Sequence, residues 1–120
     1  MSMPSVSFIR SMVARFPTLD ALLKEHIEDF EEILPHLFFG DVTRHIVSLL
    51  PAASGSDFPR RRELRDILAH LEESYSRGDD ELQELISVSF LENLPRPGEA
   101  GAQIREMVGP TLRAQLAVIG

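Results

Sequence analysis

Four histidines are the residues that first suggest chemistry in this sequence, because imidazole is a common metal ligand. A zinc site needs three or four ligands that converge on one point, often beginning with a helical pair at positions i and i+4. His26, His36 and His45 are spaced ten and nine residues apart, so they form no such pair. His26 and Asp29 could begin a site that His36 or Asp41 closes. The alternative, which we favour, is that His26 lies at the edge of the core and bonds a carbonyl, with no metal and no other cofactor.

Three glutamates form the clearest acidic cluster, since Glu25, Glu28 and Glu32 are spaced three and four residues apart. In a helix this spacing places them on one exposed face. General acid–base catalysis needs two carboxylates that face each other in a cleft, which one helix face does not provide. The face is either a solvated surface or a recognition surface for a basic protein. For the second case we predict six partner-binding residues: Glu25, Glu28, Asp29, Glu32, His36 and Asp41.

The basic counterpart is a group of four arginines, Arg60, Arg61, Arg62 and Arg65. Near the start of a helix they oppose the macrodipole, so the group needs acidic side chains nearby. Those acids could lie on a neighbouring helix or on a partner, or the arginines could hold a phosphate. The net charge of −7 argues against nucleic acid as a partner, because the phosphate backbone would be repelled.

The motifs of the common enzyme classes are missing from the sequence. It has no cysteine, and it lacks G-x-S-x-G, a P-loop and G-x-G-x-x-G. We therefore predict that the protein is not an enzyme. No apolar run approaches the roughly 18 residues of a membrane span, and no signal-peptide pattern opens the chain, so we expect no membrane contact and a cytoplasmic location.

The elements that must position these residues are short helices separated by proline and glycine. No segment alternates between apolar and polar residues with a period of two, so no sheet is expected. We predict an all-α fold, with one domain over residues 1–120 built as a compact bundle of about six to seven short helices. The helical periodicity gives these segments, with a loop at 51–58: 4–15, 18–34, 41–50, 59–76, 79–94, 100–108 and 110–118.

The segment 18–34 carries the most detailed prediction, because its apolar residues fall within one arc opposite the glutamates. Pro35 should end this helix, since a proline pushes the residue before it out of the helical region. Asp41 should then cap the next helix. The expected buried arc consists of Leu19, Leu22, Leu23, Ile27, Phe30, Ile33 and Leu34.

The segment 79–94 is apolar around most of its circumference, which predicts the central buried helix of the bundle. Three consecutive apolar residues, Leu37, Phe38 and Phe39, are expected in the turn after the second helix. They could form a small exposed patch, but we favour burial in the core.

Two stretches carry a family resemblance: H-I-E-D-F-E-E-I-L-P-H-L-F-F-G-D at 26–41, and S-V-S-F-L-E-N-L at 87–94 with a later Val-Gly-Pro at 108–110. From about Leu19 to Leu116 the chain resembles a family of small helical bacterial proteins of largely unknown function. Some of its members look like immunity proteins of toxin systems. The resemblance implies that residues 34–37 and Asp41 are a family signature, marking either the interface or the fold.

The resemblance and the acidic face lead to one functional prediction. We expect an immunity-type inhibitor that binds a cognate toxin domain in the producing cell and occludes a basic surface on it. The alternative is a non-enzymatic helical interaction or regulatory module, with homodimer formation as one version, unrelated to toxins.

Overall fold

Prolines mark the beginning of the first three helices in the computed structural model, which describes residues 4–50 and 58–119. These helices are α1 (Pro4–Arg15), α2 (Pro17–Phe30) and α3 (Pro35–Ser48). Proline suits the first turn of a helix, because its fixed φ is already helical and its missing N–H would have no partner there.

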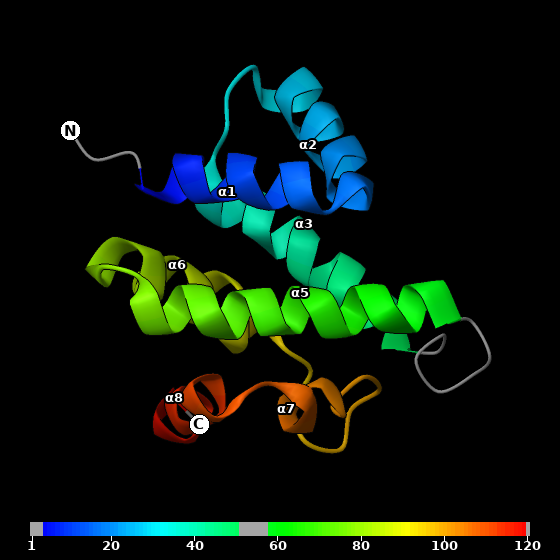
Figure 1. Cartoon of the computed structure of the whole chain (residues 1–120), viewed down its shortest axis with the longest axis vertical. Coiled ribbons are helices and arrows are strands. Elements are labelled where there is room, and N and C mark those ends of the chain that lie inside the picture. Colours follow the sequence, from blue (N-terminus) through cyan, green and yellow to red (C-terminus); the bar gives the residue numbers. More distant parts are fainter. Residues whose placement is uncertain (1–3, 51–57, 120) are drawn as a thin grey trace.

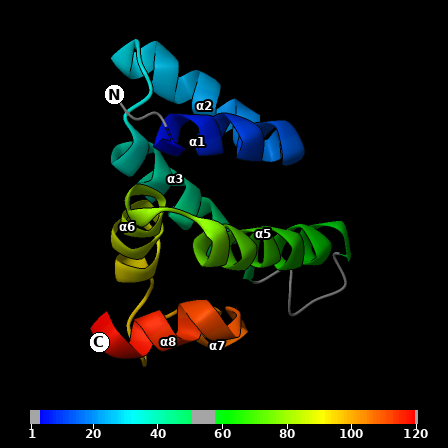
Figure 2. The same ribbon diagram turned by 60° about the vertical axis from the view of Figure 1, so that its left-hand side comes forward.

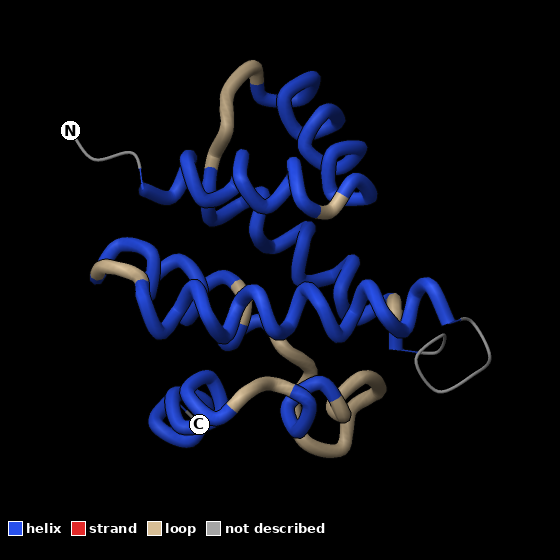
Figure 3. The backbone as a smooth tube through the Cα atoms, viewed as in Figure 1, coloured by secondary structure: helices blue, strands red, loops and turns tan. Residues whose placement is uncertain are grey.

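Residues 58–119 add four helices and one 3-10 turn. They are α5 (Phe58–Arg77), α6 (Asp80–Ser89), η1 (Leu91–Asn93), α7 (Ile104–Met107) and α8 (Pro110–Ile119). No strand occurs in the described residues (Figure 3), so the predicted all-α bundle is confirmed. In the same two ranges, no helix is both long and apolar enough to cross a membrane.

The helices are arranged in three tiers (Figure 1). Helices α1 and α2 pack against each other at one end, α3, α5 and α6 occupy the middle, and α7 and α8 close the other end. The turned view in Figure 2 shows α6 between the α1–α3 side and α8. Helix α2 packs mainly on α1 and α3, so much of its surface stays uncovered.

Helix α6 is central, as the sequence predicts, because α1, α3 and α5 all pack against it. The Asp79 side chain caps it by accepting a hydrogen bond from the Leu82 N–H at 3.0 Å. Leu85, Ile86 and Phe90 are fully buried. The helix ends at Ser89 rather than at residue 94, and the chain continues through the turn η1.

The predicted boundary between the second and third helices is wrong. Helix α2 stops at Phe30 because Glu31 takes a left-handed conformation with φ of 61°, and its N–H bonds the Ile27 carbonyl at 2.7 Å. Pro35 therefore begins α3 instead of ending α2. Asp41 lies inside α3 and pairs with Arg44, so it is not the N-cap.

The three apolar residues after Pro35 consequently lie in the first turns of α3. Phe38 and Phe39 are buried, which confirms the core reading for them, whereas Leu37 is 47% exposed. The last correction concerns α7, which is shorter than the predicted segment 100–108. Most of the expected loop at 51–58 falls outside the described residues, and residue 58 already belongs to α5.

Candidate functional site

His26 is the buried residue at the centre of the candidate site, with 2% of its surface exposed. Its ring packs between Phe30 and Phe38, with centroid distances of 4.9 and 5.4 Å. Nε2 lies 3.0 Å from the Leu34 backbone nitrogen and accepts its N–H, rather than the ring donating to a carbonyl as the sequence suggested. This bond ties the end of α2 to the start of α3.

The hydrogen bond at Nε2 determines which nitrogen of the His26 ring carries the proton. Because Nε2 accepts a hydrogen bond, the proton of the neutral ring is assigned to Nδ1. That buried Nδ1 has no hydrogen-bond partner in the part of the chain that the structure describes. The structure thus gives His26 a positioning role, because its Nε2 accepts the Leu34 N–H and holds the end of α2 against the start of α3. No group of three or more potential metal-binding side chains occurs within residues 4–50 and 58–119.

A pocket of about 340 Å³ lies beside His26, between α2 and α3. It brings together three of the six predicted partner-binding residues, Glu25, Asp29 and Asp41. The other three, Glu28, Glu32 and His36, do not line it. We call it the α2–α3 pocket; its lining consists of Leu22, Glu25, His26, Asp29, Asp41, Arg44 and His45.

The charges of this pocket divide into paired and unpaired groups. Asp41 pairs with Arg44, and His45 Nε2 lies 3.2 Å from the Glu63 carboxylate of α5. Glu25 and Asp29, by contrast, make no hydrogen bond or ion pair with any described residue. They are four residues apart in α2, so both carboxylates stand on the same side of that helix.

The C-terminal end of α2 carries acidic residues where basic residues would stabilise the helix. The last turn contains Glu28 and Asp29 but no basic residue, and Glu31 and Glu32 follow directly. All four side chains are exposed. The helix macrodipole already places partial negative charge at a C-terminus, so these carboxylates add to it. The sequence predicted that Glu25, Glu28 and Glu32 share one helix face, but α2 ends at Phe30 and Glu32 lies beyond it.

Three exposed apolar side chains accompany the acidic end of α2: Ile27 is 36%, Phe30 43% and Leu37 47% exposed. The sequence placed Ile27 and Phe30 in the buried arc, because periodicity shows that a helix has an apolar face but not how much of that face is covered. The signal that could have found them is the width of the arc, which exceeds what one neighbouring helix can cover.

The remaining predicted residues lie elsewhere. His36 is exposed, and its Nδ1 lies 2.6 Å from the Ser89 hydroxyl, so it links α3 to α6. In the arginine group, Arg62 pairs with Asp66 of its own helix at 4.0 Å rather than with a neighbouring helix. Arg61 and Arg65 line a separate pocket of about 620 Å³ between α5 and α7.

Comparison with known proteins gives a family but no activity. A family model described as "Domain of unknown function (DUF7674)" matches residues 9–118. No curated protein and no solved structure matches the chain. The resemblance to a family of largely unknown function is thereby confirmed, while its toxin-immunity part stays a prediction. Since the match extends over nearly the whole sequence, the chain belongs to the DUF7674 family.

Proposed function

We propose that this protein is a non-enzymatic binding module for a protein partner. A lysine or arginine side chain of the partner binds between Glu25 and Asp29. The observation that carries the proposal is the pair of unpaired carboxylates at the α2–α3 pocket. In the finer form of the proposal, the partner is a bacterial toxin domain, and the protein is its immunity-type inhibitor.

The backbone of α2 that carries Glu25 and Asp29 is held in place before any partner arrives. Leu19 and Leu23 are buried and anchor one side of α2 in the core. The hydrogen bond between His26 and Leu34 fixes the C-terminal end of the helix. Like charges at positions i and i+4 destabilise a helix by about 0.2–0.5 kcal/mol. A guanidinium or ammonium group would relieve the repulsion between Glu25 and Asp29 and form charge-assisted hydrogen bonds with both.

Exposed apolar residues of α2 and α3 could extend the contact with a partner beyond the two acids. Protein interfaces combine a desolvated apolar centre with a polar rim. Phe30 and Leu37 can supply apolar contacts near the end of α2. Ile27 is two residues from both Glu25 and Asp29, so it lies on the opposite side of the helix. The net charge of −7 would steer a basic partner toward this end of the molecule.

The alternative is a regulatory or interaction module without a toxin, which could be a homodimer. The exposed Ile27, Phe30 and Leu37 favour it, because two copies could bury them against each other. The carboxylates argue against self-association through this surface, since it would bring two acidic helix ends together. We therefore rank a basic protein partner first.

The proposal is tested by capturing the partner with purified protein from an extract of the cells in which the chain occurs naturally. Wild type should retain a basic protein that high salt releases. A Glu25→Lys/Asp29→Lys variant should retain at least about tenfold less of it, which corresponds to about 1.4 kcal/mol. The matched control is Glu84→Lys/Glu106→Lys, which changes the net charge equally at exposed positions on α6 and α7. Equal capture by the two variants would refute the proposal, provided that both give wild-type melting curves.

Co-expression of the captured protein distinguishes the two forms of the proposal. A toxin should stop growth alone and be neutralised by wild type, but not by Glu25→Lys/Asp29→Lys. A partner that is harmless alone would contradict the immunity form and support the regulatory module.

A further inference from the structure

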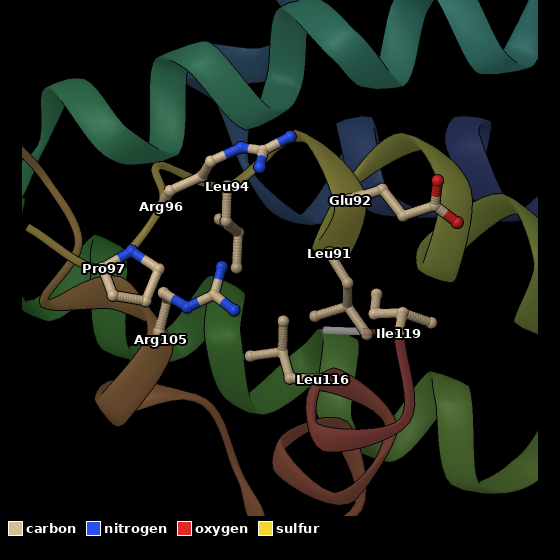
Figure 4. A pocket seen from close by; sticks show the side chains of 8 residues that line it. All are labelled: Leu91, Glu92, Leu94, Arg96, Pro97, Arg105, Leu116 and Ile119. Atoms are coloured by element: carbon tan, nitrogen blue, oxygen red, sulfur yellow. The ribbon is translucent and has the colours of Figure 1, made fainter. Parts of the chain in front are cut away.

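A third pocket, of about 500 Å³, lies at the opposite end of the molecule from α2. Its walls come from η1, the segment that follows it, α7 and the end of α8 (Figure 4). A volume of this size falls within the range of roughly 300–1,000 Å³ typical of small-molecule sites. We call it the η1–α8 pocket; it is lined by Leu91, Glu92, Leu94, Arg96, Pro97, Arg105, Leu116 and Ile119.

Two arginines define the polar side of this pocket. Arg105 is partly buried, and one of its guanidinium nitrogens donates to the Pro95 carbonyl at 3.3 Å. This bond leaves most of its N–H groups for other acceptors. The guanidinium of Arg96 has no hydrogen bond or ion pair with any described residue. In Figure 4 the two guanidinium groups lie at opposite ends of the Leu94 side chain, with that of Arg105 directed between Leu94 and Leu116.

The rest of the pocket is a leucine surface. Leu91, Leu94 and Leu116 belong to the core and show only their edges to the pocket, whereas Ile119 is partly exposed. Glu92 extends from the opposite side, away from the arginines (Figure 4). A ligand would thus meet positive charge at one end and apolar carbon at the other.

The charges and the surface together indicate the class of ligand. Among the lining residues, two guanidinium groups and one carboxylate leave one positive unit, and the nearby Glu99 carboxylate is held by the Arg96 backbone N–H at 2.7 Å. A monoanion matches this charge, and a planar carboxylate matches the donor fork of arginine. A polyanion such as nucleic acid would be repelled by the rest of the surface. We infer that the η1–α8 pocket binds a small aliphatic carboxylate, with its head at Arg96 and Arg105 and its tail toward Leu116 and Ile119.

Octanoate, octan-1-ol and acetate separate the contributions of head and tail. The full-length protein should bind octanoate saturably in a titration followed by NMR chemical shifts, with changes centred on η1 and the end of α8. Octanol and acetate should each bind at least about tenfold more weakly, because each lacks one half of the ligand. Octanol binding as tightly as octanoate would overturn the inference, as would shifts spread over the whole surface.

Variants test the same pocket from the protein side. Arg96→Gln should weaken octanoate binding about tenfold, the loss expected for one charged hydrogen-bonding group, whereas Arg10→Gln on α1 should not. Ile119→Glu should abolish binding by placing a carboxylate beside the tail. Val118→Glu changes a neighbouring, more exposed residue and should have no effect. Unchanged octanoate affinity in both Arg96→Gln and Ile119→Glu would overturn the assignment.

Discussion

Glu31 is the one non-glycine residue with positive φ in residues 4–50 and 58–119. The left-handed conformation that ends a helix is normally supplied by glycine, which has no Cβ to clash there. We expect Glu31→Gly to raise the free energy of unfolding by about 0.5–1 kcal/mol, measured by urea denaturation. The strain at Glu31 keeps a fourth carboxylate at the end of α2, where the proposed partner would bind.

The neighbouring Glu32 provides a control for this substitution. Glu32→Gly removes the same charge, but φ at this position is not positive, so the added backbone freedom should destabilise the protein slightly. If the two variants were equally stable, charge rather than backbone strain would explain the gain.

His70 should make stability depend on pH. Its ring stacks on Phe8 and meets the edge of Phe16, each at 5.7 Å between centroids. Burial lowers the pKa of His70 below its ordinary value of 6.5, the nearby Arg15 lowers the pKa further, and Glu73 partly opposes both. Below pH 6.5 the unfolded chain therefore binds a proton more readily than the folded one, and the free energy of unfolding should fall.

Two variants identify the source of this pH dependence in melting curves between pH 7.5 and 5. His70→Gln should reduce the loss of stability at low pH, because glutamine does not titrate. Arg15→Gln should reduce it less, since burial lowers the pKa more than Arg15 does. A fall that is unchanged in His70→Gln would mean that other groups cause it.

Single residues in the candidate site were only partly predictable from the sequence. Glu25, Asp29 and Asp41 line one pocket, because helical spacing and a short connection limit where they can lie, and their role in partner binding stays a prediction. His26 was correctly placed near the core, but its hydrogen bond with Leu34 depends on the path of the backbone after α2. No local pattern encodes that path.

At the scale of elements, Glu72 of α5 caps the N-terminus of α8. Its two carboxylate oxygens accept the backbone N–H groups of Thr111 and Leu112 at 2.9 and 3.0 Å. Burial alone would raise the pKa of Glu72, but the hydrogen bonds from Leu112 and Thr111 outweigh it and lower the pKa. The carboxylate also faces the positive end of the α8 dipole. Residues 39 and 40 positions apart thus join α5 to α8.

Gly109 makes this cap possible. A Cβ at this position would lie 2.6 Å from Cδ of Glu72, so an alanine would push the carboxylate off the helix end. We expect Gly109→Ala to destabilise the protein by about 1 kcal/mol, the usual value of a lost cap. Chemical denaturation of the purified variant would measure this loss.

A double-mutant cycle shows whether the cap is the cause. In a Glu72→Ala background the carboxylate is already gone, so Gly109→Ala should cost clearly less than in wild type. An equal cost in both backgrounds would show that the glycine matters for another reason, such as the backbone turn between α7 and α8.

The elements also show why the boundary between α2 and α3 was mispredicted. Residues 31–34 continue the apolar period of α2, and Pro35 can either end one helix or begin the next. The bonds from Leu34 to His26 and from Glu31 to Ile27 decide between these two arrangements. The α6 segment was predictable as the centre, because a helix that is apolar on most sides has to be surrounded by others.

At the scale of the whole molecule, charge is distributed unevenly between the two ends. The end formed by α2 carries exposed carboxylates, whereas the η1–α8 pocket at the other end carries two arginines. The composition alone gives only the net value of −7 and cannot reveal this separation. Basic proteins and small anions would therefore approach different ends of the protein, so the two proposed sites can be tested independently.

Long-range charge should control the rate of partner binding, and close contacts should control the lifetime of the complex. Glu28 and Glu32 lie outside the α2–α3 pocket, so Glu28→Lys/Glu32→Lys should mainly slow association with the captured partner. Glu25 and Asp29 line the pocket, so Glu25→Lys/Asp29→Lys should also speed dissociation. Biosensor kinetics at low and high salt measure both rates.

Salt provides the decisive comparison, because it screens distant charges more than charges in contact. The association defect of Glu28→Lys/Glu32→Lys should shrink at high salt, whereas the faster dissociation of Glu25→Lys/Asp29→Lys should persist. Glu84→Lys/Glu106→Lys, with the same net charge, should keep the wild-type dissociation rate and most of its association rate. If all three variants behaved alike, only the total charge would matter, and the α2–α3 pocket would have no part in recognition.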